Sequence, residues 1–362
     1  MDEIAYWVGF SRVPGVGRVR FSQLESHFGN LRSAWNATAD ELRQAGLDSR
    51  TIASVQTMRS RLSLEEEMER LDRYHVQTVT CKDRSYPPRL KEIYDYPPVI
   101  YVRGELTPAD QCCLAVVGTR GATIYGKQVA ADMVAGLVKG GVTIVSGLAR
   151  GIDSIAHRTA LECGGRTVAV LASGLDNVYP AENAEMAKRI IDRGALVSEY
   201  PLGIRPKPDN FPRRNRIMSG MSLGVLIIEA GESSGAIITA RQANEQNREV
   251  FAVPGSLLSP VSKGTNHLIQ RCEAKLVTDY TDILAELNLT MVAEQLEMKE
   301  VQAGSEAESV LLSQVSAEPV HIDEICRRSG LRTSEVTSTL ALMELKGVVR
   351  QLGGMNYVLA KR

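Results

Sequence analysis

The sequence predicts a doubly wound α/β fold: a mostly parallel, Rossmann-like sheet preceded by a small helical domain and followed by a winged helix. Residues 112–284 alternate apolar strand candidates with helical candidates. These strand candidates are apolar throughout, which is typical of parallel strands covered on both faces. Residues 310–360 follow the order helix, helix–turn–helix and hairpin, which is the winged-helix pattern.

The N-terminal segment, residues 1–75, predicts helices throughout. Asp40 is a suitable N-cap for a helix that ends before Gly46. Ser63 is a suitable N-cap for the acidic helix that follows it. We therefore expect a small N-terminal helical domain of the helix–hairpin–helix type.

Residues 76–288 predict the sheet domain. Its expected strands are 76–81, 99–102, 112–118, 142–147, 167–174, 195–200, 224–230, 249–255 and 275–279. Its expected helices are 124–139, 153–163, 182–193, 235–246 and 263–271. Five Glu against one Lys predict an acidic linker over 289–308, and the winged helix is expected over 309–362, with its hairpin turned at Gly353–Gly354.

The composition is that of an ordinary globular chain of 362 residues, with 44% hydrophobic residues and a net charge of −1. A nucleic acid would therefore have to be bound by a local basic patch. No apolar run approaches the ~18 residues that cross a bilayer, and the first residues lack the apolar core of a signal peptide. The six Cys and five His form no zinc-type cluster. We expect a cytoplasmic protein with free thiols, no membrane contact, and no metal or other cofactor.

Glycine-rich turns follow three of the expected strands. The carboxyl ends of parallel strands meet at one edge of the sheet, where such folds bind ligands. Glycine lets backbone N–H groups approach an anion, and helices that begin there add the positive end of their dipoles. The turns predict a phosphate-binding edge with the candidate residues Gly118, Thr119, Arg120, Gly121, Gly147, Arg150, Gly151, Ser234 and Gly235.

A strongly basic segment, residues 202–220, follows the strand expected at 195–200 and should overhang the same edge. It has five Lys or Arg against the single acid Asp209, and it contains an aromatic residue. Cations neutralise phosphates while an aromatic ring stacks a base, which is how single-stranded nucleic acids are bound. A solvated loop with a packing Phe is the alternative. The candidate residues are Arg205, Lys207, Phe211, Arg213, Arg214, Asn215 and Arg216.

Enzymatic alternatives have weaker support. The chain has no GxGxxG fingerprint and no GxxxxGK[ST] loop, which disfavours a dinucleotide oxidoreductase and a P-loop NTPase. Gly231, Ser233 and Gly235 match the GxSxG elbow of hydrolases, but no Asp lies between Ser233 and His267. A phosphoribohydrolase on a related sheet would carry a PGGxGT-type turn, which is absent. The hydrolase and the nucleotide-processing enzyme stay open as minor alternatives to a non-enzymatic protein.

Two peripheral features leave their function open. The segment Val13-Pro14-Gly15-Val16-Gly17 is similar to the turn of a helix–hairpin–helix, whose amides contact a phosphate in some proteins and serve only as structure in others. The helix expected at 333–346 is poor in basic residues, which favours a protein partner for the winged helix over a duplex major groove.

Several segments, read in order, resemble the bacterial DNA-processing protein A family (DprA/Smf). They are YPPRLKEI, VGTRGATIYG, VSGLARGIDSIAH, GGRTVAVLASGLDNVYP, LVSEYPLG, FPRRNRIMSG, LIIEAGESSGAIITARQA and VFAVPG. The resemblance covers about residues 75–285 and implies a non-enzymatic protein that binds and protects single-stranded DNA. It further implies loading of the RecA recombinase during natural transformation, and a homodimer formed through the Rossmann-like domain. The DNA pocket that it implies contains Gly118, Arg120, Gly121, Lys207, Phe211, Arg213, Arg214 and Arg216.

Overall fold

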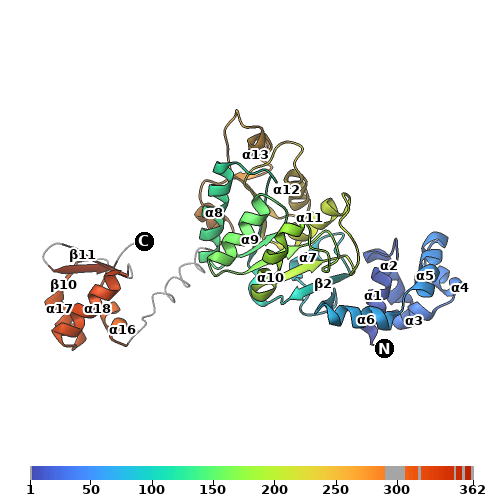
Figure 1. Ribbon diagram of the computed structural model, residues 1–362, viewed down its shortest axis with the longest axis horizontal. Helices are drawn as coiled ribbons and strands as arrows, with labels where there is room; N and C mark the ends of the chain where they lie inside the picture. The colour runs from blue at the N-terminus through green and yellow to red at the C-terminus, as the bar shows by residue number, and fades with distance from the viewer. Residues whose placement is uncertain (1, 290–305, 317–318, 346–347, 353–354, 360–362) are drawn as a thin grey trace. The chain divides into compact units, whose positions relative to one another are not determined.

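The structure is a computed structural model. The chain folds into two compact units, residues 1–289 and 290–362. The residues it describes are 2–289, 306–316, 319–345, 348–352 and 355–359 (Figure 1). Most of the acidic linker expected over 289–308, and the hairpin turn expected at Gly353–Gly354, lie outside the described residues.

Helices fill the N-terminal part of the first unit, as predicted. They are α1 Glu3–Ser11, α2 Arg18–Phe28, α3 Leu31–Asn36, α4 Ala39–Gln44, α5 Ser49–Arg61 and α6 Leu64–Arg73. Ser63 caps α6 as expected, accepting a hydrogen bond from the Glu66 N–H. The prediction that Asp40 caps α4 is wrong. Thr38 accepts from the Glu41 N–H and the Glu41 carboxylate accepts from the Thr38 N–H, so a capping box starts the helix earlier.

A nine-stranded sheet with the order β1-β2-β6-β5-β4-β3-β7-β8-β9 lies at the centre of the first unit. Its strands are β1 Gln77–Thr80, β2 Val99–Gly104, β3 Cys113–Val117, β4 Thr143–Ser146, β5 Thr167–Val170, β6 Ala195–Ser198, β7 Gly224–Ile227, β8 Glu249–Ala252 and β9 Lys275–Leu276. The strands from β6 to β9 in this order are parallel to one another. Strand β2 pairs antiparallel with both of its neighbours, β1 and β6. Every residue of β3 to β7 is buried, which confirms the doubly wound, mostly parallel sheet.

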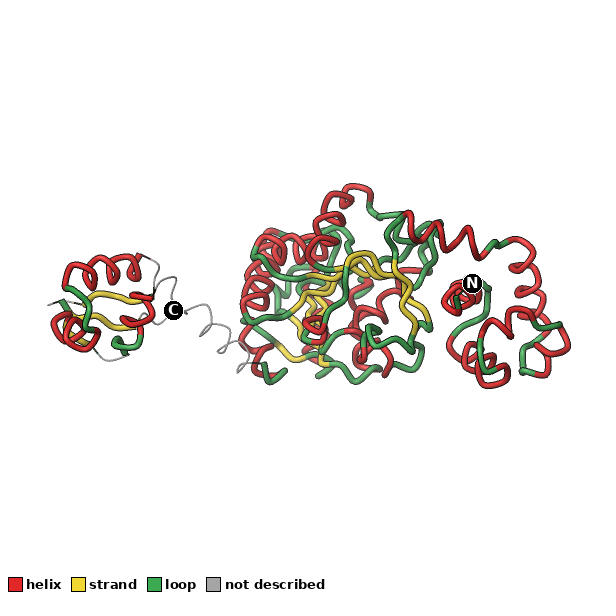
Figure 2. The backbone as a smooth tube through the Cα atoms, turned by 90° about the horizontal axis from the view of Figure 1, so that it is seen from below, coloured by secondary structure: helices red, strands yellow, loops and turns green. Residues whose placement is uncertain are grey.

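Helices cover both faces of this sheet (Figure 2). They are α7 Pro88–Glu92, α8 Ile124–Lys139, α9 Ile152–Glu162, α10 Ala184–Arg193, α11 Asn210–Met221, α12 Gly235–Glu245, α13 Lys263–Gln270 and α14 Tyr280–Glu286. Helix α11 was not among the helices expected from the sequence. Pro212 lies in its first turn, where no N–H partner is lost, and Ile217, Met218 and Met221 are buried.

The N-terminal helices and the sheet share one hydrophobic core. Tyr101 of β2 is fully buried, and its hydroxyl lies 2.7 Å from the hydroxyl of Ser11 at the end of α1. Arg12 donates a hydrogen bond of 2.9 Å to the carbonyl oxygen of Leu202. The helical segment is therefore fixed against the sheet edge formed by β1 and β2.

The second unit has the winged-helix arrangement expected from the sequence. Its elements are α16 Glu306–Leu312, β10 Val320–His321, α17 Ile322–Ser329, α18 Thr333–Leu345, β11 Val349–Leu352 and β12 Asn356–Leu359. Its core contains Leu311, Ile325, Leu340 and Tyr357. In the described parts of both units, no helix is long and apolar enough to cross a membrane. The same residues contain no group of three or more His, Cys, Asp or Glu side chains placed to hold a metal ion.

His157, fully buried on α9, makes the first unit sensitive to acid. Its Nδ1 lies 2.7 Å from the Thr167 hydroxyl, and burial lowers the pKa of His157 to about 3. The unfolded chain takes up this proton near pH ~6.5, so below that pH only the unfolded state is protonated. We expect this histidine to cost up to about 1.4 kcal/mol of stability per pH unit as the pH falls from ~6.5 towards 3.

Urea unfolding between about pH 7 and about pH 5 measures this dependence. Fluorescence reports the first unit alone, because Trp7 and Trp35 are the only tryptophans of the chain. His157→Asn removes the titrating group and should flatten the profile. An unchanged pH profile in that variant would contradict the assignment.

Candidate nucleic-acid interface

A cleft of about 830 Å³ opens at the carboxyl edge of the sheet, where β3 and β7 end. From β3 the chain winds outward through β4, β5 and β6, and it then returns to β7 on the other side of β3. Ligands of doubly wound folds bind at such a topological switch point. The walls of the cleft are the turn after β3, the turn before α12 and one side of α11. We call it the first cleft.

Arg120 and Phe211 meet in the first cleft. Arg120 is exposed on the turn after β3, and its guanidinium carbon lies 5.3 Å from the centre of the Phe211 ring. Phe211 is half-buried in the first turn of α11 and also contacts Tyr179 edge to face, with ring centres 6.0 Å apart. The structure thus brings together the glycine turn and the basic segment, which are about 90 residues apart in sequence.

The turn that carries Arg120 is held firmly by its neighbours. The Thr119 N–H donates to the carbonyl oxygen of Glu229 (2.7 Å), and the Gly121 N–H donates to the Thr119 hydroxyl (3.2 Å). Gly118 packs so tightly that an added Cβ would lie 2.5 Å from the Ile152 side chain. Arg120 therefore projects from a preorganised turn.

The glycine turn after β4, which contains Gly147 and Gly151, supports the Arg120 turn, and two of its amides bind a carboxylate of the protein. The N–H groups of Gly147 and Ala149 donate to the carboxylate of Asp153, at 3.1 and 3.3 Å. Gly151 has a φ of 72° and packs on the backbone of the Arg120 turn. Arg150 pairs with Glu182 through two hydrogen bonds of 2.9 and 3.0 Å. The Gly147 N–H and the Arg150 guanidinium thus already have partners within the protein. Phosphate binding by Gly147, Arg150 and Gly151 stays a prediction.

Helix α11 distributes the basic segment over two opposite sides. Successive helical residues differ by ~100° around the axis, so Phe211, Asn215 and Met218 share one face. All three line the first cleft. Arg213 and Arg216 lie on the opposite face and line a different cleft. The expectation that Arg213 and Arg216 lie beside Phe211 is therefore wrong. Arg205 and Lys207, on the segment before α11, are exposed and form no ion pair with any described residue.

Arg214 forms part of the floor of the first cleft but is only 4% exposed. Its Nη1 donates a hydrogen bond of 2.6 Å to the carbonyl oxygen of Val170, at the end of β5. Burial lowers the pKa of Arg214 to about 10, and the buried Asp153 opposes that effect. An added Cβ on Gly147 would lie 1.8 Å from the Arg214 guanidinium, so this glycine makes room for it. Arg214 is a structural cation, contrary to the sequence-based expectation of a direct phosphate contact.

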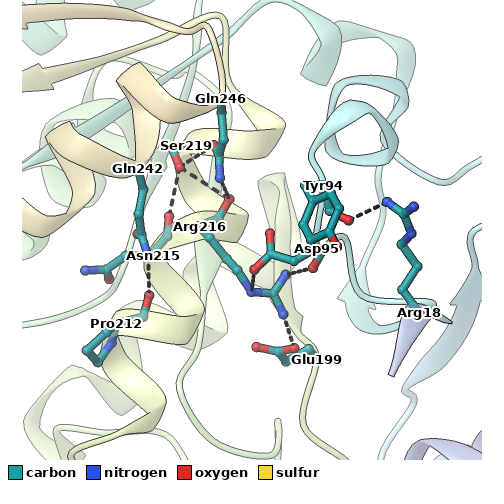
Figure 3. A network of polar contacts seen from close by, with 10 residues as sticks. All are labelled: Arg18, Tyr94, Asp95, Glu199, Pro212, Asn215, Arg216, Ser219, Gln242 and Gln246. Carbon is teal, nitrogen blue, oxygen red and sulfur yellow. Dashed lines mark hydrogen bonds and ion pairs between the residues drawn. The ribbon is translucent and has the colours of Figure 1, made fainter. Parts of the chain in front are cut away.

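Arg216 is held in a polar network on the far side of α11 (Figure 3). It donates a hydrogen bond of 2.6 Å to the carbonyl oxygen of Asp95, and it forms ion pairs with the carboxylates of Asp95 and Glu199. These partners neutralise its charge.

The turn before α12 presents a helix start to the first cleft. Ser234 caps α12 by accepting from the Ala236 N–H at 3.3 Å. Gly235 is exposed, and as the first helical residue its N–H has no acceptor within the helix. Ser233 forms no hydrogen bond to a histidine in the described residues, and His267 instead pairs with Glu232 at 2.9 Å. The geometry therefore gives no support to the hydrolase alternative.

Family comparison agrees with this architecture. Residues 77–288 match the family model of DNA recombination-mediator protein A, and residues 297–355 match that of the DprA winged helix domain. The chain belongs to the DprA/Smf family.

Three relatives in the DprA/Smf family match between 59% and 98% of this chain. Protein Smf of Synechocystis sp. is 34% identical over 98% of both chains. Protein Smf of Escherichia coli is 38% identical over 89% of this chain and 87% of the relative. DNA processing protein DprA of Bacillus subtilis is 43% identical over 59% of this chain and 71% of the relative.

Two solved DprA structures share the fold. That of DNA processing protein A from Streptococcus pneumoniae has a TM-score of 0.68 at 33% identity, covering 78% of this chain and 97% of that one. That of DNA processing protein A from Helicobacter pylori, described for its single-stranded DNA binding mode, has a TM-score of 0.54 at 30% identity. It covers 59% of this chain and 97% of that one.

Lys263 and Asp153 are among the residues of the first cleft that the sequence did not indicate as site residues in this DprA family member. Lys263 is exposed at the start of α13 and lines the cleft. It follows the strand expected at 249–255, so the strand-end argument could have found it. Asp153 lies on the cleft floor, and nothing in its local sequence distinguishes it from a surface carboxylate.

Proposed function

We propose that the first cleft binds single-stranded DNA and that the chain acts in DNA recombination without catalysing a reaction. The observation that carries this proposal is the contact of Arg120 with Phe211 at the switch point of the sheet. A guanidinium beside an aromatic ring binds a phosphate and stacks a base, which single-strand binding requires. The relative from Helicobacter pylori, described for its single-stranded DNA binding mode, supports the same ligand.

The residues of the cleft have distinct roles in this proposal. The Arg120 guanidinium lies over the Phe211 ring; a base stacks on this pair, and the guanidinium N–H groups bind the adjoining phosphate. Gly235, at the start of α12, and Lys263 add positive charge along the wall. None of these groups reads the edge of a particular base. Binding should therefore tolerate any sequence and weaken with salt.

Arg120→Ala and Phe211→Ala should each weaken binding of a fluorescent single-stranded oligonucleotide by about 1–3 kcal/mol, since each removes one member of the pair on which the base stacks. Fluorescence anisotropy at fixed salt measures the change. Arg189→Ala is a matched control, because Arg189 is exposed on α10 and lines neither cleft. Wild-type affinity in both cleft variants would reject the site.

The further roles we propose are protection of the bound strand, loading of RecA onto it, and a homodimer formed through the sheet domain. Membership of the recombination-mediator family supports them. Faster RecA filament assembly on strands already covered by a single-strand-binding protein would demonstrate loading. Sedimentation equilibrium measures the dimer. If the Arg120→Ala variant still loads RecA at the wild-type rate, RecA loading does not depend on DNA binding in the first cleft.

A further inference from the structure

A second cleft, of about 700 Å³, lies on the other side of α11. Its walls are α11, the loop that carries Tyr94 and Asp95, and the turn between α1 and α2. Arg216 extends from α11 towards this loop, and Arg18 reaches the same loop from α2 (Figure 3). The proposed function of the first cleft does not use any of these groups.

The second cleft contains cations that its own carboxylates do not neutralise. Four arginines line it, of which Arg20 pairs with Asp48 and Arg216 pairs with Asp95 and Glu199. Arg18 and Arg213 form no ion pair with any described residue, and Arg213 is exposed. Two positive charges therefore remain for a ligand.

An exposed aromatic side chain lies beside these cations. Tyr94 is 83% exposed, which is unusual for a large ring in a folded protein. The guanidinium carbon of Arg18 lies 5.3 Å from the ring centre of Tyr94 and 5.0 Å from that of Tyr96. Arg18 also donates to the Tyr94 carbonyl oxygen, which fixes it against the loop. The arrangement repeats the pairing of Arg120 with Phe211 in the first cleft.

Helix α11 is the wall that the two clefts share. Phe211 and Asn215 face the first cleft, and Arg213 and Arg216 face the second. A helix with its side chains is only ~10 Å across, so a chain molecule that leaves the first cleft over Pro212 reaches Arg213 directly. This continuity favours the nucleic acid of the first cleft as the occupant over an unrelated acidic peptide.

We propose that the second cleft is an additional subsite for the same single strand, on the assumption that the proposed function of the first cleft is correct. The strand crosses α11 beside Pro212, Arg213 and Arg18 bind its phosphates, and a base stacks on Tyr94. The turn around Gly17 forms the far wall, and Gly17 provides no side-chain cap for the first N–H groups of α2. The helix–hairpin–helix segment thereby contacts DNA as an extension of the first cleft.

The dependence of the affinity of the full chain on oligonucleotide length tests this subsite. An oligonucleotide of about 4 nucleotides matches the smallest single-strand binding sites, so it fills the first cleft alone. One of about 20 nucleotides is longer than typical sites, so it can reach the second cleft as well. Arg18→Ala, Arg213→Ala and Tyr94→Ala should each weaken binding of the long oligonucleotide about tenfold and leave the short one unchanged. Each lost phosphate contact should also lower the slope of log affinity against log salt by about 0.7. Arg189→Ala is again the control.

The outcomes separate the two proposals. If Arg120→Ala weakens binding of both oligonucleotides while Arg18→Ala and Arg213→Ala leave the long one unchanged, the second subsite is refuted and the first cleft stands. If Arg120→Ala leaves the binding of both oligonucleotides unchanged, the proposed function of the first cleft is refuted. Binding of a poly-glutamate peptide that depends on Arg18, with unchanged binding of the long oligonucleotide, would make the second cleft a peptide site and overturn the proposal. A photo-crosslink from an iodinated base to Tyr94 would support it directly.

Discussion

Arg214→Met is expected to destabilise the first unit by about 3–5 kcal/mol, a larger effect than that of any other arginine of the basic segment. Arg214 is nearly inaccessible to solvent, and its hydrogen bond to the Val170 carbonyl ties α11 to the end of β5. Asp153 is 5% exposed, and its burial raises its pKa. Among the groups that lower this pKa, the positive charge of Arg214 has the largest effect. Removing the guanidinium leaves this carboxylate buried without its cation.

Urea unfolding followed by the fluorescence of the two tryptophans measures the loss. The double variant Arg214→Met/Asp153→Asn removes both charges, and it should recover a substantial part of the stability. A single variant as stable as the wild-type chain would contradict the structural role of Arg214. A double variant no better than the single one would contradict its coupling to Asp153.

Gly151→Ala is expected to destabilise the first unit by about 2–5 kcal/mol and to weaken single-strand binding as well. Gly151 has φ 72° and ψ −126°, a conformation open to glycine and costly for every other residue. Its added Cβ would lie 2.3 Å from the Thr119 carbonyl oxygen and 2.7 Å from the backbone of Arg120. The turn that carries Arg120 would have to move, so its guanidinium would leave the Phe211 ring.

Thermal unfolding and anisotropy titration together measure these two effects. Gly121→Ala is the matched control for stability, because a Cβ there meets no atom within 4 Å. Gly121 belongs to the same turn, so the comparison isolates the contact made by Gly151. Equal stability of the two variants would show that the close approach of Gly151 carries no energetic cost.

Local patterns were enough to predict most of the first unit. The predicted helix at 124–139 coincides with α8, and each of the nine predicted strands overlaps an observed one. These segments are apolar enough to be buried in any arrangement, so their sequence determines their structure. Helices α7, α11 and α14 were missed. The segment of α11 is rich in charge and proline, and its helix is stabilised by contacts with distant residues such as Val170 and Glu199.

The sequence by itself determined the doubly wound sheet, the winged helix and the meeting of Arg120 with Phe211 at one edge. Each of these follows from short-range periodicity and from the rule that parallel strands end together. Only the tertiary structure decided which cations remain available. Arg214 became buried beside Asp153, Arg216 became neutralised by Asp95 and Glu199, and Arg213 remained exposed in a second cleft. The physical reason is that the position of each side chain around the axis of α11 decides its neighbours, and those neighbours come from β5, α9, the segment after β6 and the loop before β2.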